Sequence, residues 1–216
     1  SGLTNEKPSA TRVFFDHGAR HAPAIRGVFP GGACRLSPIE GSRTGVITMT
    51  QPMAARPTAS SILYQGELFA DYFQLYLHDE GHPDLPDDYT DEVLARRLMV
   101  GPYAVVLQTA RNMTVPIRVE WHDQRPAPDL DAYQHVVEAR FDCPSGQLVL
   151  AGLTDYAPTA PRLPVTVGPL GVRASFSGLD TLDEDGLEGD DRYVIQLWPG
   201  AGTEGVRVLK TWPEAR

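Results

Sequence analysis

The 216-residue sequence predicts a mainly β fold, an antiparallel β-sandwich of about nine strands with one short helix. From about Ile62 onward, short segments rich in β-branched and aromatic residues recur, and most end in Gly, Pro, Asp or Asn. A single segment has apolar residues at the helical period. Short strands at this spacing are typical of a sandwich or barrel, and the 42% apolar and 22% charged residues suit a globular chain.

Nine segments carry the strand pattern. The first alternates aromatic or polar residues with apolar ones, so both of its faces are expected to bury part of their surface. The tripeptide "PSG" at 144–146 separates two segments and predicts a tight hairpin turn. In chain order the segments are "ADYFQLYLHD" (70–79), "YAVVLQTA" (103–110), "VPIRVEWHD" (115–123), "HVVEARFD" (135–142), "QLVLAGL" (147–153), "LPVTVG" (163–168), "GVRASFSG" (171–178), "YVIQLW" (193–198) and "VRVLKTW" (206–212).

The one helix is expected at about residues 90–99, within "YTDEVLARRLM". Thr90 is a suitable N-cap because its hydroxyl can accept a hydrogen bond from the first turn. Asp91 and Glu92 follow in that turn, where the helix dipole favours negative charge. Apolar residues then recur near the 3.6-residue period, which predicts that one side of the helix lies on the sheet through Val93, Leu94, Leu98 and Met99.

The first 58 residues differ from the rest of the chain. They mix Gly, Pro and Arg with isolated hydrophobic residues and carry a net charge of +4, which predicts an irregular, basic N-terminal arm. Residues 59–216 carry −13 and are expected to form a single sandwich domain. Because Met49 and Met53 precede the boundary, the sequence leaves open whether residues 1–52 belong to the native protein. A homo-oligomer held by the arm is a further hypothesis.

The acidic body limits the classes of partner. Its charge repels phosphates, so direct binding of nucleic acid is not expected. A basic protein suits it better, because opposite fields raise the encounter rate, and solubility alone is the alternative purpose. No apolar run approaches the roughly 18 residues of a membrane span, and there is no visible signal peptide. Two cysteines in dissimilar contexts make no disulfide framework, which predicts a cytoplasmic location.

The most acidic stretch is "LDTLDEDGLEGDDR" at 179–192. A Ca²⁺ loop would need an oxygen ligand at its first position, Gly at the sixth and a bidentate acid at the twelfth. With Gly186 sixth, the first position is Thr181 and the twelfth is Arg192, so the spacing favours a solvated acidic connection. Its carboxylates are the candidates to face a basic partner: Asp180, Asp183, Glu184, Asp185, Glu188, Asp190 and Asp191.

No residue set specifies a reaction, a metal or a cofactor, and none is expected. Two histidine pairs have the four-residue spacing of helical zinc ligands, but neither lies in a helical segment or near cysteines at metal spacing. Cys143 is expected to be a small buried side chain and Ser145 a turn residue, since no Gly-x-Ser-x-Gly elbow is present. The histidine pairs are His17 with His21 and His78 with His82.

Two polar strings predict buried hydrogen-bond networks. "TARNMTVP" places Arg111 and Asn112 between two strands, where a guanidinium can clamp a carboxylate or the turn itself. "DYFQLYLHDE" places Gln74 among aromatic residues on a core strand, and a buried amide needs partners.

At these strings the sequence resembles the competence protein J family. The resemblance covers roughly residues 62–152 and consists, in order, of "YFQLYLHD" (72–79), "YTDEVLARRL" (89–98), "TARNMTVPIRVE" (109–120) and "FDCPSGQLVLAG" (141–152). That family is known for a small protein that inhibits a DNA-entry nuclease. The resemblance implies a bacterial, β-rich binding protein that blocks a nuclease, and it supplies no catalytic or interface residues.

The sequence therefore favours a non-enzymatic protein that binds a basic protein, such as a nuclease, as its inhibitor or immunity partner. An acidic surface can occupy the basic, phosphate-binding cleft of a nuclease. Two alternatives stay open. One is a β-sandwich that binds a small ligand or carbohydrate, with Trp121, Trp198 or Trp212 as a stacking platform. The other is an enzyme of unknown class, with convergent polar groups in a cleft.

Overall fold

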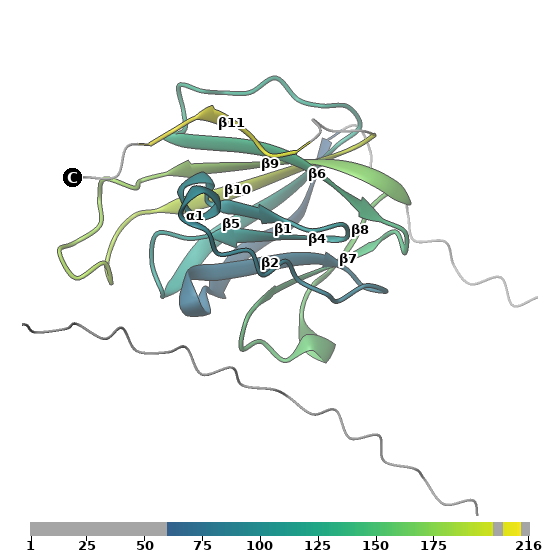
Figure 1. Cartoon of the computed structure of the whole chain (residues 1–216), viewed down its shortest axis with the longest axis horizontal. Helices are drawn as coiled ribbons and strands as arrows, with labels where there is room; N and C mark the ends of the chain where they lie inside the picture. Colours follow the sequence, from purple (N-terminus) through teal and green to yellow (C-terminus); the bar gives the residue numbers. More distant parts are fainter. Residues whose placement is uncertain (1–59, 201–204, 213–216) are drawn as a thin grey trace, which may run out of the picture. The chain divides into compact units, whose positions relative to one another are not determined.

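The computed structural model describes residues 60–200 and 205–212, and the predicted arm of residues 1–58 lies outside them (Figure 1). No helix in this described part is long and apolar enough to cross a membrane. The elements in chain order are β1 (Ser60–Phe69), η1 (Asp71–Phe73), β2 (Gln74–Asp79), α1 (Asp91–Arg96), β3 (Leu98–Val100), β4 (Ala104–Gln108), β5 (Thr114–His122), β6 (His135–Cys143), β7 (Gln147–Gly152), η2 (Ala157–Thr159), β8 (Arg162–Pro164), β9 (Gly168–Ser177), β10 (Arg192–Pro199) and β11 (Arg207–Lys210).

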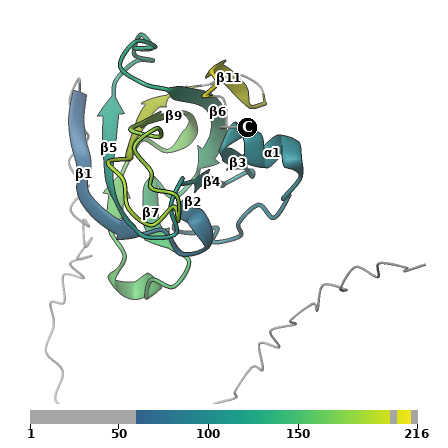
Figure 2. The same ribbon diagram turned by 90° about the vertical axis from the view of Figure 1, so that its left-hand side faces the viewer.

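The strands form two sheets, which confirms the mainly β sandwich. A six-stranded sheet has the order β1-β5-β10-β9-β6-β11, and a five-stranded sheet has the order β3-β4-β2-β7-β8. Figure 2 shows the larger sheet curving around the smaller one. Each of the nine predicted segments overlaps a strand, although 163–168 shares only Leu163 and Pro164 with β8, and β1 and β3 are additional. The pairing is antiparallel except between β10 and β5, which are parallel, as a long connection between two strands permits.

One hydrophobic core joins the inner faces of both sheets. Strand β5 shows the underlying alternation, since Val115, Ile117, Val119 and Trp121 are buried and the residues between them are half-buried or exposed. The same core receives Leu75 and other residues of β2, β4 and β7 from the smaller sheet. Burial of each such side chain stabilises the fold by roughly 1.5–3 kcal/mol, which is why the alternating segments predict the strands correctly.

The outer face of the larger sheet carries a buried polar row. Strand register places Glu138 opposite Arg173, Arg173 opposite Gln196, and Gln196 opposite Glu120, across β6, β9, β10 and β5. Arg173 Nε donates to Glu138 Oε1 at 2.8 Å, Arg173 Nη1 to Gln196 Oε1 at 3.0 Å, and Gln196 Nε2 to Glu120 Oε2 at 3.1 Å. Arg173 and Glu138 are each only 1% exposed.

The segment between β5 and β6 covers this row. Arg173 also donates to the carbonyl oxygens of Pro126 and Ala127, and Arg125 donates to Glu138 Oε2 at 2.6 Å. The Trp198 ring lies over Arg173, with its centroid 5.5 Å from the guanidinium carbon. Because both faces of the sheet are covered here, seven consecutive residues of β9 are buried, from Leu170 to Phe176.

Gly171 makes room for the Trp198 ring. The two residues face each other across β9 and β10, and a Cβ on Gly171 would lie 2.1 Å from the indole. No side chain fits at that distance, so the closeness of the two strands requires glycine.

The helix is shorter than predicted. Thr90 does cap it, since its Oγ1 accepts from the backbone N of Val93 at 3.4 Å, but the helix ends at Arg96 and Arg97 adopts the left-handed conformation with φ 55°. Leu98 and Met99 belong to β3 and are buried in the smaller sheet. The prediction that Leu98 and Met99 belong to the apolar side of a helix over 90–99 is therefore wrong, because both residues pack as part of a strand.

The first predicted strand also begins later than expected. Residues 71–73 form a single 3₁₀ turn in which Tyr72 and Phe73 have φ of 51° and 61°, and both side chains are exposed. Only from Gln74 onward does the segment pair with β4 and β7. The local alternation of residues 70–79 is continuous, so the sequence does not mark this change.

The "PSG" turn joins the two sheets and does not form a hairpin. Strand β6 belongs to the larger sheet and β7 to the smaller one, so 144–146 carries the chain between them. The buried Asp79 at the end of β2 fixes this turn. Its Oδ2 accepts from the backbone N of Ser145 at 2.9 Å and from Cys143 Sγ at 3.2 Å, while its Oδ1 accepts from Gly81 N and from His82 Nδ1 at 2.9 and 2.8 Å.

Asp79 should make stability dependent on pH. Burial alone would raise its pKa, but hydrogen bonds from Ser145, His82 and Cys143 outweigh burial and hold the pKa of Asp79 well below its ordinary 3.8. A lowered pKa contributes stability above the ordinary value and loses it as the pH falls. We expect Asp79→Asn to reduce the free energy of unfolding by about 2 kcal/mol at pH 6. In urea unfolding, this difference from the wild type should shrink below about pH 3.8; a difference that stays constant down to about pH 2 would contradict it.

Candidate protein-binding surface

The candidate surface lies at one end of the sandwich, which we call the loop end. Here β4 and β9 end and β2, β5 and β10 begin, so the turns between them gather in one region. Figures 1 and 2 agree that the β9–β10 loop, α1 and the turn before β2 all lie at this end. The acidic sequence at 178–191 forms the β9–β10 loop.

Most of the loop's carboxylates face solvent. The exposed ones are Asp180, Asp183, Glu184, Asp185, Glu188 and Asp190. Asp183 also shapes the loop, because its Oδ1 accepts from the backbone N atoms of Leu187 and Glu188 at 2.8 and 3.2 Å. Gly186 follows with φ 66°, a conformation that glycine adopts without steric cost. The loop is thus a folded turn that displays acids.

Asp191 is a correction to the predicted partner-facing set. Its side chain is fully buried and accepts hydrogen bonds from Arg111 Nε and from the Tyr193 hydroxyl. Arg111 Nη1 in addition donates to the carbonyl oxygen of Leu187 at 3.0 Å. A buried carboxylate needs such charge-assisted partners, so Asp191 anchors the acidic loop and does not present charge to solvent.

Tyr193 completes this anchor. Its hydroxyl accepts from the backbone N of Ala110 at 2.7 Å and donates to Asp191. Burial, together with the Asp191 carboxylate, raises the pKa of Tyr193 far above its usual 10.0, so the hydroxyl keeps its proton. The turn at residues 109–113, which contains Arg111, is therefore attached to the acidic loop, although the two segments are far apart in the sequence. In the sequence, the only sign of this contact is a guanidinium that needs a partner.

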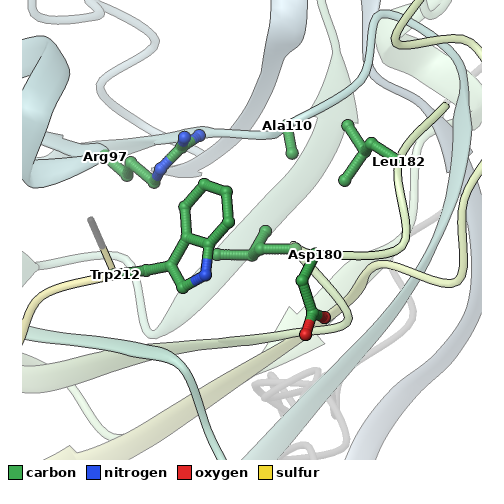
Figure 3. A pocket seen from close by; sticks show the side chains of 6 residues that line it. Arg97, Ala110, Asp180, Leu182 and Trp212 are labelled. Carbon is green, nitrogen blue, oxygen red and sulfur yellow. The ribbon is translucent and has the colours of Figure 1, made fainter. Parts of the chain in front are cut away.

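A cleft of about 380 Å³ lies beside the loop. Figure 3 shows the Arg97 and Trp212 side chains next to each other, with Ala110 and Leu182 across from them and Asp180 as a further lining residue. Trp212 is the half-buried member of the three tryptophans. Trp121 and Trp198 are 1% and 3% exposed, so the predicted stacking platform is wrong for both of them.

The two other polar residues of the predicted networks lie at the same end. Gln74 is buried, and its Oε1 accepts from the Tyr76 hydroxyl at 2.5 Å and from the Tyr89 hydroxyl at 3.4 Å. Asn112 is half-buried, and its Oδ1 is enclosed without a hydrogen-bond partner among the described residues. The structure thus brings Gln74, Arg111 and Asn112 to the loop end, each in a different environment.

The other candidates for chemistry that lie within residues 60–200 and 205–212 do not assemble into a site. Among the described residues no three His, Cys, Asp or Glu side chains are placed to hold a metal ion. His17 and His21 lie outside the described residues, whereas His82 binds Asp79 and stacks on Tyr103. Burial, followed by the hydrogen bond to Asp79, raises the pKa of Cys143 to about 12, so this thiol is a poor nucleophile.

Comparison with known proteins supports the fold. No family model matches the sequence, and no curated protein matches it. The structure is similar to that of ComJ from Bacillus subtilis, an inhibitor of the DNA-degrading activity of NucA, with a TM-score of 0.53 and 13% identity over 65% of this chain and 98% of ComJ. A second match, described as Crocagin biosynthetic gene J, has a TM-score of 0.45 and 18% identity over 65% of this chain and 98% of that one. The chain therefore shares the fold of ComJ over nearly the whole length of ComJ.

Proposed function

We propose that this chain binds a basic nuclease and blocks its activity, as an inhibitor or immunity partner without enzymatic activity of its own. The likeness in fold to ComJ, a nuclease inhibitor, is the observation that carries the proposal. The exposed acids of the β9–β10 loop support it, because a nuclease carries a basic cleft for phosphates. In this proposal the loop enters that cleft and excludes DNA.

The direct test mixes the purified full chain and plasmid DNA with each basic nuclease of the same organism in turn. At an equal molar amount of the chain, most of the plasmid should remain intact, and the two proteins should elute together in size-exclusion chromatography. Bovine serum albumin at the same concentration controls for nonspecific acidic protein. Full degradation at a severalfold excess of the chain, with no complex on the column, would overturn the proposal.

Neutralising the tip of the loop should slow association. We expect Asp183→Asn/Glu184→Gln/Asp185→Asn to lower the association rate about tenfold at low salt, because opposite fields steer the encounter. The amide oxygen introduced at position 183 can still accept the turn's hydrogen bonds, so the fold is expected to stay intact. Stopped-flow mixing with the nuclease at two salt concentrations measures the effect, which should be much smaller at about 0.5 M salt.

A matched control removes the same charge elsewhere. The control variant is Asp123→Asn/Asp129→Asn/Asp131→Asn. These three acids are exposed on the segment that covers the outer face of the larger sheet. This variant has the same net charge as the loop variant, so its association rate should fall by less than a factor of about two. Equal slowing by both variants would assign the effect to net charge and leave the loop without a specific role.

A further inference from the structure

The loop end also exposes a group of aromatic and aliphatic side chains, which we call the tyrosine patch. Its members are between 40% and 68% exposed and border two adjoining open clefts of about 370 and 310 Å³. Exposed apolar groups that cluster in this way mark binding surfaces more often than scattered ones do. The patch consists of Tyr72, Phe73, Tyr89, Leu94 and Leu153.

Backbone geometry turns two of these residues outward. Tyr72 and Phe73 both adopt left-handed conformations, which aromatic residues rarely occupy because of steric crowding. Their rings gain little burial in exchange, since they are 68% and 45% exposed. A backbone conformation that costs folding free energy without burying the side chain is typical of residues at binding sites.

The smaller cleft is lined by three tyrosine rings, Tyr72, Tyr76 and Tyr89, together with Gln74 and Leu153. The side-chain oxygen of Gln74 accepts hydrogen bonds from two of the tyrosines and thereby fixes their orientation. Burial, then Tyr89 and the nearby Asp71 carboxylate, raise the pKa of Tyr76 to about 12. The cleft therefore combines aromatic faces with the nearby Asp71 carboxylate, and this combination favours a cation.

Gln108 supplies a second, independent indication of a ligand. It is 7% exposed, it lines the larger cleft, and its Nε2 has no hydrogen-bond partner among the described residues. A buried amide donor without an acceptor is costly, and a carbonyl oxygen entering the cleft would remove that cost once the Gln108 amide turns toward it. Because the two clefts share Tyr72, Gln74 and Tyr89, one bound segment can reach both.

The surrounding charge selects the sign of the ligand. The segment around Tyr89 and the first turn of α1 expose acids on both sides of this tyrosine. Two arginines lie nearby: Arg96 pairs with Glu92, and Arg97 lines the larger cleft. The smaller cleft has no arginine or lysine among its described lining residues. A cationic side chain in the smaller cleft thus finds complementary charge beside it, whereas the larger cleft suits a neutral backbone group. The acids are Asp87, Asp88, Asp91 and Glu92.

We infer that the smaller cleft receives an arginine or lysine side chain of the partner protein, while Gln108 donates to a backbone carbonyl oxygen beside it. This inference rests on the proposed function, because it names the side chain by which the basic partner is recognised. Aromatic residues packed around a basic side chain are typical of the few contacts that dominate binding energy. The acidic loop would then attract the partner, and the tyrosine patch would hold it.

A small probe tests the cleft without any nuclease. N-acetyl-L-arginine-N-methylamide is titrated into the full chain, and the ring resonances of isotope-labelled tyrosines are followed by NMR. We expect saturable shifts, with about tenfold weaker binding of the neutral citrulline analogue, since the aromatic rings favour the charge. Tyr72→Gly and Tyr89→Ala should abolish the response, and Gln108→Leu should weaken it about threefold. Equal binding of the two probes would overturn the inference.

Control variants separate the cleft from the rest of the surface. Tyr156 is 71% exposed and lines neither cleft, so Tyr156→Ala should keep the response. Tyr72→Gly should not lower the melting temperature, because glycine accepts a φ of 51°. If the probe binds but the chain gives no nuclease protection, the cleft stands and the proposed function fails. If nuclease inhibition persists at full strength in Tyr72→Gly, the cleft is not the contact.

Discussion

Replacing Glu138 by Gln is expected to lower the free energy of unfolding by about 3–5 kcal/mol. The substitution keeps the shape of the side chain but removes the charge that faces Arg173, which is 1% exposed. A guanidinium left in a buried site without its counter-charge has lost its hydration and keeps only neutral acceptors, here the carbonyl oxygens of Pro126 and Ala127 and the amide oxygen of Gln196. Equilibrium unfolding in urea, followed by tryptophan fluorescence, measures the loss.

The matched control is Glu80→Gln. Glu80 also binds an arginine, since Arg162 Nε lies 3.2 Å from its Oε1, but the two side chains are 48% and 30% exposed. Ion pairs open to solvent contribute little, so the control should lose less than about 1 kcal/mol. If the two variants lose the same amount, the polar row on the outer face is not the stabilising network that its burial indicates.

The second large effect is expected for Arg111→Met. This change leaves the buried Asp191 with Tyr193 as its remaining side-chain partner among the described residues, and it should cost about 3–5 kcal/mol of stability. It also frees the Leu187 carbonyl oxygen, so the acidic loop loses its attachment to the turn at 109–113. Urea unfolding measures the stability, and hydrogen exchange should become faster in the amides of residues 179–190.

Two further variants test the reason for this loss. Adding Asp191→Asn to Arg111→Met should restore part of the stability, because the uncompensated buried charge is then gone. Arg118→Met removes an arginine that pairs with Glu120 and is 44% exposed, and it should cost less than about 1 kcal/mol. No recovery in the double variant, or unchanged exchange in the loop, would contradict the anchor.

Anchoring bears on the proposed function. An acidic loop fixed in place loses less conformational entropy on binding than a mobile one. Arg111→Met should therefore weaken nuclease inhibition even under conditions in which the variant remains folded. The proposal thus makes one buried arginine important for an interface that its own side chain does not reach.

Local sequence patterns predict much of the fold. The alternation in 115–121 identifies β5, the Thr90 cap and its two acids mark the start of α1, and the nine patterned segments each overlap a strand. These features depend on residues only a few positions apart, which is why they can be recognised without the structure. Strand β3 was not predicted because Leu98 and Met99 continue the helical period, while a left-handed Arg97 ends the helix before them.

The candidate site was predictable only in part. The acidic composition of 180–191 is visible in the sequence, as is the need of Arg111 for a partner. That this partner is Asp191, and that Asp191 therefore cannot face a nuclease, depends on a contact between residues 80 positions apart. The tyrosine patch was missed because Tyr72 and Phe73 fit a strand pattern and turn outward only through their backbone conformation.

The order of the residues was enough to specify the mainly β class, the place where the helix starts, and the acidic character of the β9–β10 loop. Three features required the packed structure: which acids are buried, which aromatic residues face solvent, and that the acidic loop and the tyrosine patch share one end of the sandwich. Periodicity and composition are properties of neighbouring residues, and this explains the division. Burial and charge pairing depend instead on which strands pack together, and here the decisive pairs, Glu138 with Arg173 and Arg111 with Asp191, are distant in sequence.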